Sequence, residues 1–295
     1  MTHDRNEAEI EESRAPLMDH LIELRGRLLI CVIGFVIGFL ICFYYASPIQ
    51  IFLIKPYQAA TAIHAAAAAH GGHGNPIELL EVTSGLKPFP KDGQSAVELI
   101  ATAPLEQLFS KMKIAGFGAI VLAFPIIAWQ LYRFVAPGLY RNERGAFLPF
   151  LLAAPALFVL GGALVYFVML PFVMLFTLSQ QVVGDGIAVV QTTKISEYLS
   201  LVTSLLLAFG LCFQLPVVTT LLGLAGILTS KLMVASRRYA IVGVVVIAAV
   251  VTPPDPISQL MLAIPLVLLY EVSIWCVRII ELRKRKDDVA DGPMA

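Results

Sequence analysis

Long apolar runs alternate with short polar segments along this chain. Six runs stand out, at residues 28–46, 112–132, 147–172, 198–224, 239–251 and 257–277. A helix needs about 20 apolar residues to cross the hydrocarbon layer of a bilayer, and most of these runs reach that length. The fifth is shorter, and the proline-rich segment 252–256 after it predicts a tight turn. The pattern therefore predicts an all-α polytopic membrane protein with six transmembrane helices, of which the last two form a short hairpin.

Composition strengthens this prediction. Hydrophobic residues make up 58% of the chain, charged residues 14%, and the mean hydropathy is +0.81. A soluble domain has about 25% charged residues. The net charge is zero, so bulk charge gives no reason to expect a nucleic-acid partner. The first apolar run is long for the core of a signal peptide, which favours an uncleaved first span.

The distribution of Lys and Arg predicts the orientation. If the N-terminus is cytoplasmic, the inner segments hold 15 of the 21 Lys and Arg residues. Cytoplasmic loops are enriched in these residues, so both termini are predicted to be cytoplasmic. The expected organisation is a cytoplasmic segment at 1–27, a six-span membrane domain at 28–277 with a periplasmic loop at about 47–111, and a basic cytoplasmic tail at 278–295.

Prolines and small residues modify the expected helices. A proline inside a helix removes a backbone hydrogen bond and bends it, and bent spans can enclose a concave face. Four spans contain one, at Pro125, Pro155, Pro216 and Pro265. Gly34 and Gly38 fit a close-packing motif, which serves either a contact within the chain or dimerisation.

Neither metal binding nor catalysis is indicated. The four cysteines lie far apart inside apolar runs, where small apolar packing explains them. His64, His70 and His73 could bind a metal, but an Ala/Gly-rich insertion with incidental histidines explains them as well. Nucleotide-binding, zinc-protease and serine-hydrolase motifs are missing from the sequence. We predict no catalytic residue, no metal and no cofactor.

Charged side chains gather at the predicted cytoplasmic border. Glu23 and Arg27 are spaced as stabilising i, i+4 neighbours on a helix. Either this is a solvated helix start whose arginines anchor the first span, or Glu23 is presented to a ligand. Glu143 lies between Arg141 and Arg144, so local charge pairing also explains it.

Three segments together resemble one family. They are HLIELRGRL at 20–28, FVAPGLYRNER at 134–144 and TPPD at 252–255. In this order and membrane context they are similar to the TatC family, the multispanning subunit of the twin-arginine protein translocase. The resemblance implies a cupped helical fold in the bacterial inner membrane, where the protein would be a receptor for twin-arginine signal peptides of folded precursors. It also implies export driven by the proton gradient, and a hetero-oligomer of several copies with single-span TatA and TatB subunits.

The resemblance assigns a signal-peptide site to Glu23, Glu143, Phe134 and Arg25. The chemistry is consistent, because a guanidinium binds a carboxylate through a planar pair of hydrogen bonds that lysine cannot reproduce. Each such bond contributes about 1.5–3 kcal/mol. Two carboxylates held apart on one surface would therefore discriminate paired arginines from paired lysines.

Polar residues within the spans form a second set. Thr252 and Gln259 match a family patch that docks a partner helix, and Gln214 stands where the family often has Glu. Glutamine keeps hydrogen bonding but cannot ionise, which argues against a proton relay at this position. Alternatively, Gln214 satisfies carbonyl groups that Pro216 leaves without a donor.

Two further residues have predicted structural roles. Pro56 is expected to cap or kink the helix near the outer end of the first span. Asp255 is expected to cap the sixth helix. Glu271 is predicted to pair with Arg278 or with a neighbouring helix, and residues 103–109 could form a short surface helix before the second span.

Two other classes of protein fit part of the sequence. Proline-broken helices and Gln214 would suit a secondary transporter of a small solute, but such transporters usually contain two similar halves, and no internal repeat is evident. An intramembrane enzyme would need a nucleophile and a base at membrane depth, and the predicted spans contain no histidine.

Overall fold

The structure is a computed structural model that describes residues 3–69, 81–84, 86–87, 99–135, 147–180, 182–184, 187–189, 193–224, 226–251 and 256–290. Its elements are α1 (His3–Tyr44), α2 (Ala46–Ala69), α4 (Glu106–Val135), α5 (Phe147–Leu164), the π-helical turn η4 (Val165–Met169), α6 (Leu170–Ser179), β1 (Val182–Gly184), β2 (Ile187–Val189), α7 (Ile195–Cys212), α8 (Leu215–Leu224), α9 (Ser230–Val251) and α10 (Pro256–Ala290). Strands β1 and β2 pair as a small antiparallel hairpin. Within the described residues, six helical segments are long and apolar enough to cross a membrane, which confirms the predicted all-helical, six-span fold.

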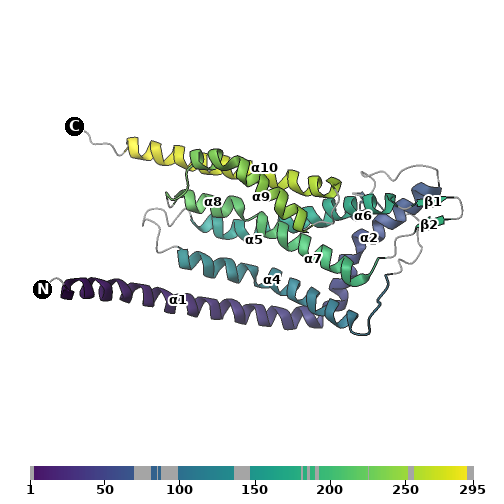
Figure 1. The fold of residues 1–295 in the computed structure, drawn as a ribbon, viewed down its shortest axis with the longest axis horizontal. Coiled ribbons are helices and arrows are strands. Elements are labelled where there is room, and N and C mark those ends of the chain that lie inside the picture. Colours follow the sequence, from purple (N-terminus) through teal and green to yellow (C-terminus); the bar gives the residue numbers. More distant parts are fainter. Residues whose placement is uncertain are drawn as a thin grey trace.

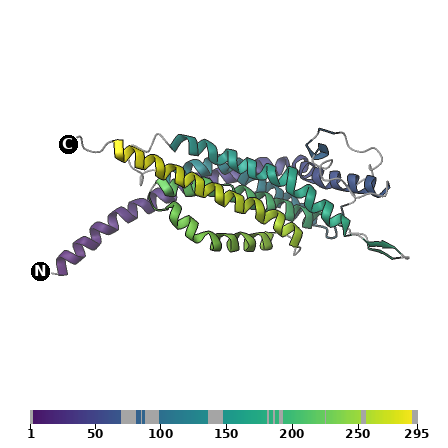
Figure 2. The same cartoon turned by 90° about the horizontal axis from the view of Figure 1, so that it is seen from above.

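The helices lie side by side along the longest axis of the molecule (Figures 1 and 2). Both chain ends lie at one end of this bundle, while α2 and the β1–β2 hairpin lie at the other (Figure 1). This arrangement agrees with an even number of crossings.

The predicted fifth span was too short. Helix α9 begins at Ser230, nine residues before the predicted start at 239, and has 22 residues. The apolar run in the sequence is bounded by Lys231, Arg237 and Arg238. Basic residues do not end a helix when their side chains have polar partners, so the helix continues through them. The last two spans are therefore a hairpin of full length. The segment 103–109 is not a separate helix either, because α4 already begins at Glu106.

Helix α2 lies within the segment that was expected to be a long loop, and Pro56 is inside it rather than near the end of the first span. A proline at position 56 cannot donate to the carbonyl of Phe52, four residues earlier. The Tyr166 hydroxyl donates to that carbonyl at 2.8 Å. The Tyr198 hydroxyl donates to the next carbonyl, that of Leu53, also at 2.8 Å. Two buried tyrosines from other elements thus hold the kinked part of α2 against the bundle.

Helix packing follows from small side chains and apolar faces. Helix α1 packs mainly on α4, α10 packs on α8 and α9, and α5 packs on α7. A Cβ atom at Gly38 would lie 3.2 Å from the carbonyl oxygen of Ala119, and one at Gly34 would lie 3.2 Å from the side chain of Ile126. The glycine motif therefore serves a contact between α1 and α4. The main buried core is centred on Leu199, Val202 and Leu205 of α7.

Candidate functional site

The first predicted site residues lie in the middle of α1, at the level of the last turns of α4, which Arg27 contacts. Glu23 and Arg27 form the ion pair that their i, i+4 spacing predicts, with Arg27 Nε donating to Glu23 Oε1 at 3.1 Å. The Glu23 side chain is 44% exposed, whereas that of Arg27 is only 16% exposed. Arg25 is exposed on the same helix.

Arg27 also links α1 to α4. Its Nη1 atom donates to the backbone carbonyl of Gln130 at 3.4 Å. Phe134 lies four residues further along α4, so its backbone is on the last turn of the helix that Arg27 contacts. The side chain of Phe134 and the whole of Glu143 lie outside the described residues. The structure therefore brings Glu23 near the polar end of α4, and the second carboxylate stays a prediction.

This geometry defines what Glu23 can do chemically. Its carboxylate is solvent-accessible at a bundle end and is already held by a guanidinium, that of Arg27. An arriving guanidinium would find an acceptor of the right type, and at the Oε1 oxygen it would compete with Arg27. The pair thus shows in the folded chain the kind of contact that a bound arginine would make.

Gln214 lies at the break between α7 and α8. Its amide nitrogen donates to the carbonyl of Ala154 in α5 at 2.9 Å, with a longer contact of 3.5 Å to the carbonyl of Gly210. Neither of these acceptors is the carbonyl of Cys212. Cys212 lies four residues before Pro216, so its carbonyl is the one that the proline leaves without a helical donor. Gln214 therefore ties the broken fourth span to the third, instead of satisfying the carbonyl that Pro216 leaves without a donor.

Gln259, of the predicted docking patch, joins the last two spans. Its amide nitrogen donates to the carbonyl of Val245 in α9 at 3.3 Å, and its side chain is partly exposed. Thr252 and Asp255 lie outside the described residues, so their predicted docking and capping roles stay predictions.

Further polar contacts hold the other ends of α9 and α10 together. Arg237 Nη2 donates to Glu271 Oε2 at 2.9 Å, and Arg237 Nε lies 2.7 Å from Glu271 Oε1. This confirms the prediction that Glu271 pairs with a neighbouring helix. The prediction missed Glu281, which accepts hydrogen bonds from the backbone and side chain of Ser230 and thereby caps the start of α9. Nothing in the local sequence indicates a cap that comes from 51 residues away.

A second missed cluster surrounds Glu106 at the opposite end of the bundle. The Glu106 carboxylate accepts from the backbone nitrogens of Thr102 at 2.6 Å and Ala103 at 3.2 Å, and from the Ser196 hydroxyl. An acidic residue in the first turn is a common signal for the start of a helix, so Glu106 itself carried part of this information. The contact with Ser196, which fixes the start of α4 to α7, could not be read from it.

Cysteine and histidine, the other candidate ligand types, can be followed in the part of the chain that the structure describes. That part contains no group of three His, Cys, Asp or Glu side chains arranged to hold a metal ion. All four cysteines are free thiols. His64 lies on α2, while His70 and His73 lie outside the described residues.

Six apolar spans and a polar face at one bundle end define a multi-pass helical membrane protein. The sequence profile described as "Sec-independent protein translocase protein (TatC)" matches residues 19–265. The chain belongs to the TatC family.

Named relatives and a solved structure match this chain over nearly its whole length. The Sec-independent protein translocase protein TatC of Magnetococcus marinus is 38% identical over 280 residues, which cover 95% of this chain and 90% of that protein. The protein of the same name from Aquifex aeolicus is 36% identical, with 92% and 98% coverage. A solved structure described as the twin arginine translocase receptor TatC is 34% identical and superposes with a TM-score of 0.68 over 88% of this chain and 98% of that one.

Proposed function

We propose that this chain is the signal-peptide receptor and core subunit of a twin-arginine translocase, which exports folded proteins across the bacterial inner membrane at the expense of the proton gradient. The observation that carries the proposal is the match over most of the chain to a solved twin arginine translocase receptor. The exposed carboxylate of Glu23 at a polar bundle end supports it. The relatives are translocase proteins by name, so a solute transporter is not favoured.

In this proposal, Glu23 and Glu143 each bind one guanidinium of the signal peptide, with Arg25 and Phe134 beside them. An incoming arginine that binds the Oε1 oxygen of Glu23 would replace Arg27 there. Such an exchange replaces one charge-assisted bond by another, so the resident pair lowers the cost of keeping the carboxylate partly buried before the peptide arrives.

Partner helices form the second half of the proposal. TatA-type and TatB-type subunits would dock on the last hairpin near Thr252 and Gln259, with Gln214 contributing from the fourth span. The Gln259 amide contacts one backbone carbonyl and keeps part of its surface exposed, which suits a residue that fixes the register of a partner helix. The termini and the Glu23 end of the bundle would face the cytoplasm, in a hetero-oligomer of several copies.

The decisive experiment measures binding of a fluorescent twin-arginine peptide to the purified full chain. Glu23→Gln should weaken binding at least about tenfold, because a charge-assisted bond of about 1.5–3 kcal/mol is lost. Arg27→Gln is the matched control, since it breaks the same intramolecular pair but keeps the carboxylate. It should retain or tighten binding.

A second control tests whether the loss of any carboxylate weakens peptide binding, or only the loss of the one at Glu23. Glu197 carries a 72% exposed carboxylate that is paired with Lys194 at the other end of the bundle, and Glu197→Gln should change nothing. A peptide with lysines in place of both arginines should bind weakly to every variant. If Glu23→Gln and Arg27→Gln lose binding equally, the Glu23 carboxylate is not the ligand and the pair has only a structural role.

A further inference from the structure

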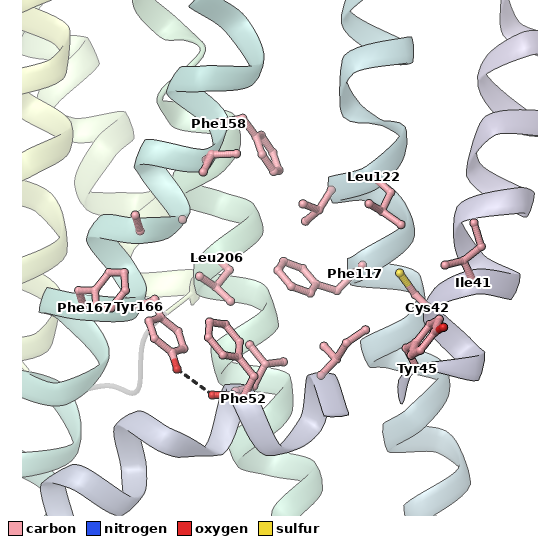
Figure 3. Close-up of a pocket in the computed structure, with 17 residues that line it drawn as sticks. Ile41, Cys42, Tyr45, Phe52, Phe117, Leu122, Phe158, Tyr166, Phe167 and Leu206 are labelled. Atoms are coloured by element: carbon pink, nitrogen blue, oxygen red, sulfur yellow. Dashed lines mark hydrogen bonds between the residues drawn. The ribbon is translucent and has the colours of Figure 1, made fainter. Parts of the chain in front are cut away.

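An apolar groove opens between the α1–α4 pair and α5, near the end of the bundle that carries α2 (Figure 3). Its volume is about 510 Å³. Ring and aliphatic side chains form its walls, among them Phe117 and Leu122 of α4, Phe158 of α5 and Leu206 of α7 (Figure 3). These residues lie within the first four membrane spans or next to them, so the groove is at membrane depth.

The wall of the groove is rigid and has little capacity left for hydrogen bonding. The Tyr166 hydroxyl is committed to the Phe52 carbonyl, and the two rings stack with centroids 4.5 Å apart and planes 4° from parallel. The Tyr45 ring, with its hydroxyl, lines the groove at the point where α1 ends (Figure 3). An occupant of the interior therefore needs no polar group there, and it can place one only near the α2 end.

A π-helical turn shapes this wall. Leu170 donates its backbone N–H to the carbonyl of Val165, five residues earlier, and Pro171 follows directly. The turn brings both Tyr166 and Phe167 to the lining of the groove, with their rings in edge-to-face contact at 5.0 Å. Such turns are rare and occur frequently at functional sites.

The size of the groove selects its occupant. An α-helix with side chains is about 10–12 Å across, so a volume of this size would hold only about one turn of a partner helix. Water binds poorly in an apolar cavity because it finds no hydrogen-bond partners there. An empty cavity, in turn, lacks the dispersion contacts that an apolar occupant would make. We propose that the groove binds one acyl chain of a membrane phospholipid, with the headgroup end of the chain beside Tyr45. Tyrosines at a helix end commonly mark the headgroup level, and Tyr44 and Tyr45 are packed edge to face there.

Two glycines allow a matched test. A Cβ atom at Gly162, which lines the groove, would meet only the Leu206 side chain at 3.9 Å, so Gly162→Leu fills the groove without a clash at its first atom. A Cβ atom at Gly243 of α9 would have no atom within 4 Å, so Gly243→Leu adds the same bulk away from the groove.

The full-length protein is reconstituted in phospholipid vesicles that contain a phospholipid with a photoreactive diazirine near the end of one acyl chain. After irradiation, labelled peptides are identified by mass spectrometry. Labelling should concentrate on the α4 and α5 peptides that contain Leu122 and Phe158, several-fold above labelling of the exposed α9 residue Val246. Gly162→Leu should reduce the groove labelling several-fold, and Gly243→Leu should leave it unchanged.

Several results would overturn the proposal. One is groove labelling that equals labelling of α9, and another is groove labelling that persists in Gly162→Leu. If that variant does not elute as a folded species, Val159→Phe, at a 60% exposed position in the lining, replaces it with the same expectation. Labelling by a diazirine fatty acid but not by the phospholipid would assign the groove to free fatty acids. A photoreactive side chain at Leu122 that captures a protein instead of lipid in native membranes would assign it to a partner helix.

Discussion

At the scale of single residues, the kink of α2 shows how one helix compensates for a donor that another lacks. Pro56 leaves the Phe52 carbonyl without a helical donor, and Tyr166 supplies a hydroxyl from η4. A buried acceptor that loses its partner costs about 1–3 kcal/mol. The sequence indicated that Pro56 would bend a helix, but not which distant side chain would complete the kink, because that partner lies 114 positions from Phe52.

Tyr166→Phe should therefore lower the free energy of unfolding by about 1–3 kcal/mol, because it leaves the Phe52 carbonyl unsatisfied. Thermal unfolding in detergent measures the change. Tyr239→Phe, at an exposed position, is the control and should stay within about 0.5 kcal/mol of the unmodified protein. In a Pro56→Ala background the helix regains its own donor, so the cost of Tyr166→Phe should shrink. An unchanged cost there would show that the two residues are not coupled through the carbonyl.

Adjacent glycines in α5 should respond in opposite ways to the smallest possible substitution. A Cβ atom at Gly161 would lie 2.8 Å from the Phe209 carbonyl oxygen and 2.9 Å from the Phe213 ring, whereas one at Gly162 meets only ordinary contacts. Gly161→Ala should destabilise the fold by about 1–3 kcal/mol through overpacking. Gly162→Ala should be neutral or slightly stabilising. Equal melting temperatures for the two variants would contradict the close approach of α5 and α7.

At the scale of elements, the apolar runs predict the membrane spans, but they do not predict helical segments that polar contacts or packing stabilise. Helix α9 extends past its apolar run because Arg237 finds Glu271 and because Glu281 caps Ser230. Helix α2 lies in a segment between two apolar runs, which predicts a loop, although its alanines and apolar residues suit a helix packed on α6. An apolar run marks the part of a helix that lies in the membrane, and the helix itself can extend beyond that part.

The Arg237–Glu271 ion pair should stabilise the packing of α9 against α10. Arg237→Ala and Glu271→Ala should each lower the melting temperature, and a double-mutant cycle should give a coupling of about 0.5–1 kcal/mol. The value is modest because the two side chains are 43% and 33% exposed, so solvent screens the interaction. Raising the salt concentration should reduce the coupling. Additive single-variant effects would show that the ion pair contributes nothing to the joint.

At the scale of the whole molecule, the number of spans and the local Glu23–Arg27 pair could be predicted, and the packing that brings distant residues together could not. The motif around Glu23 carried the family resemblance, and its i, i+4 spacing gave the Arg27 pair. The contact of Arg27 with Gln130 joins positions 103 residues apart, and pattern alone holds no information on such a pairing. Local spacing predicts local partners, whereas the pairing of α1 with α4 depends on how the complete bundle packs.

The predicted orientation can be tested in intact cells with a membrane-impermeant thiol reagent. In a background with the four native cysteines replaced, Ser84→Cys and Lys194→Cys should be labelled from outside, because both positions lie at or beyond the span ends that face away from the termini. Ser13→Cys and Lys286→Cys should be labelled only after the membrane is opened, because the topology that places most Lys and Arg residues in the cytoplasm also places both termini there. External labelling at position 13 or 286 would reverse the assigned topology.

The spans differ widely in how much they depend on protein neighbours. Only 11% of the apolar window of the first span is buried inside the bundle, against 50% for the third and fourth. The main neighbour of α1 is α4, which is synthesised some 60 residues later, so the first span must remain in lipid on its own apolarity while the ribosome continues. The third and fourth spans carry Tyr166 and Tyr198, whose hydroxyls bond to α2, so they cannot reach their packed state until α2 is in place. Insertion of this bundle thus begins with the span that protein neighbours bury least, and the two most buried spans follow in the middle of the chain.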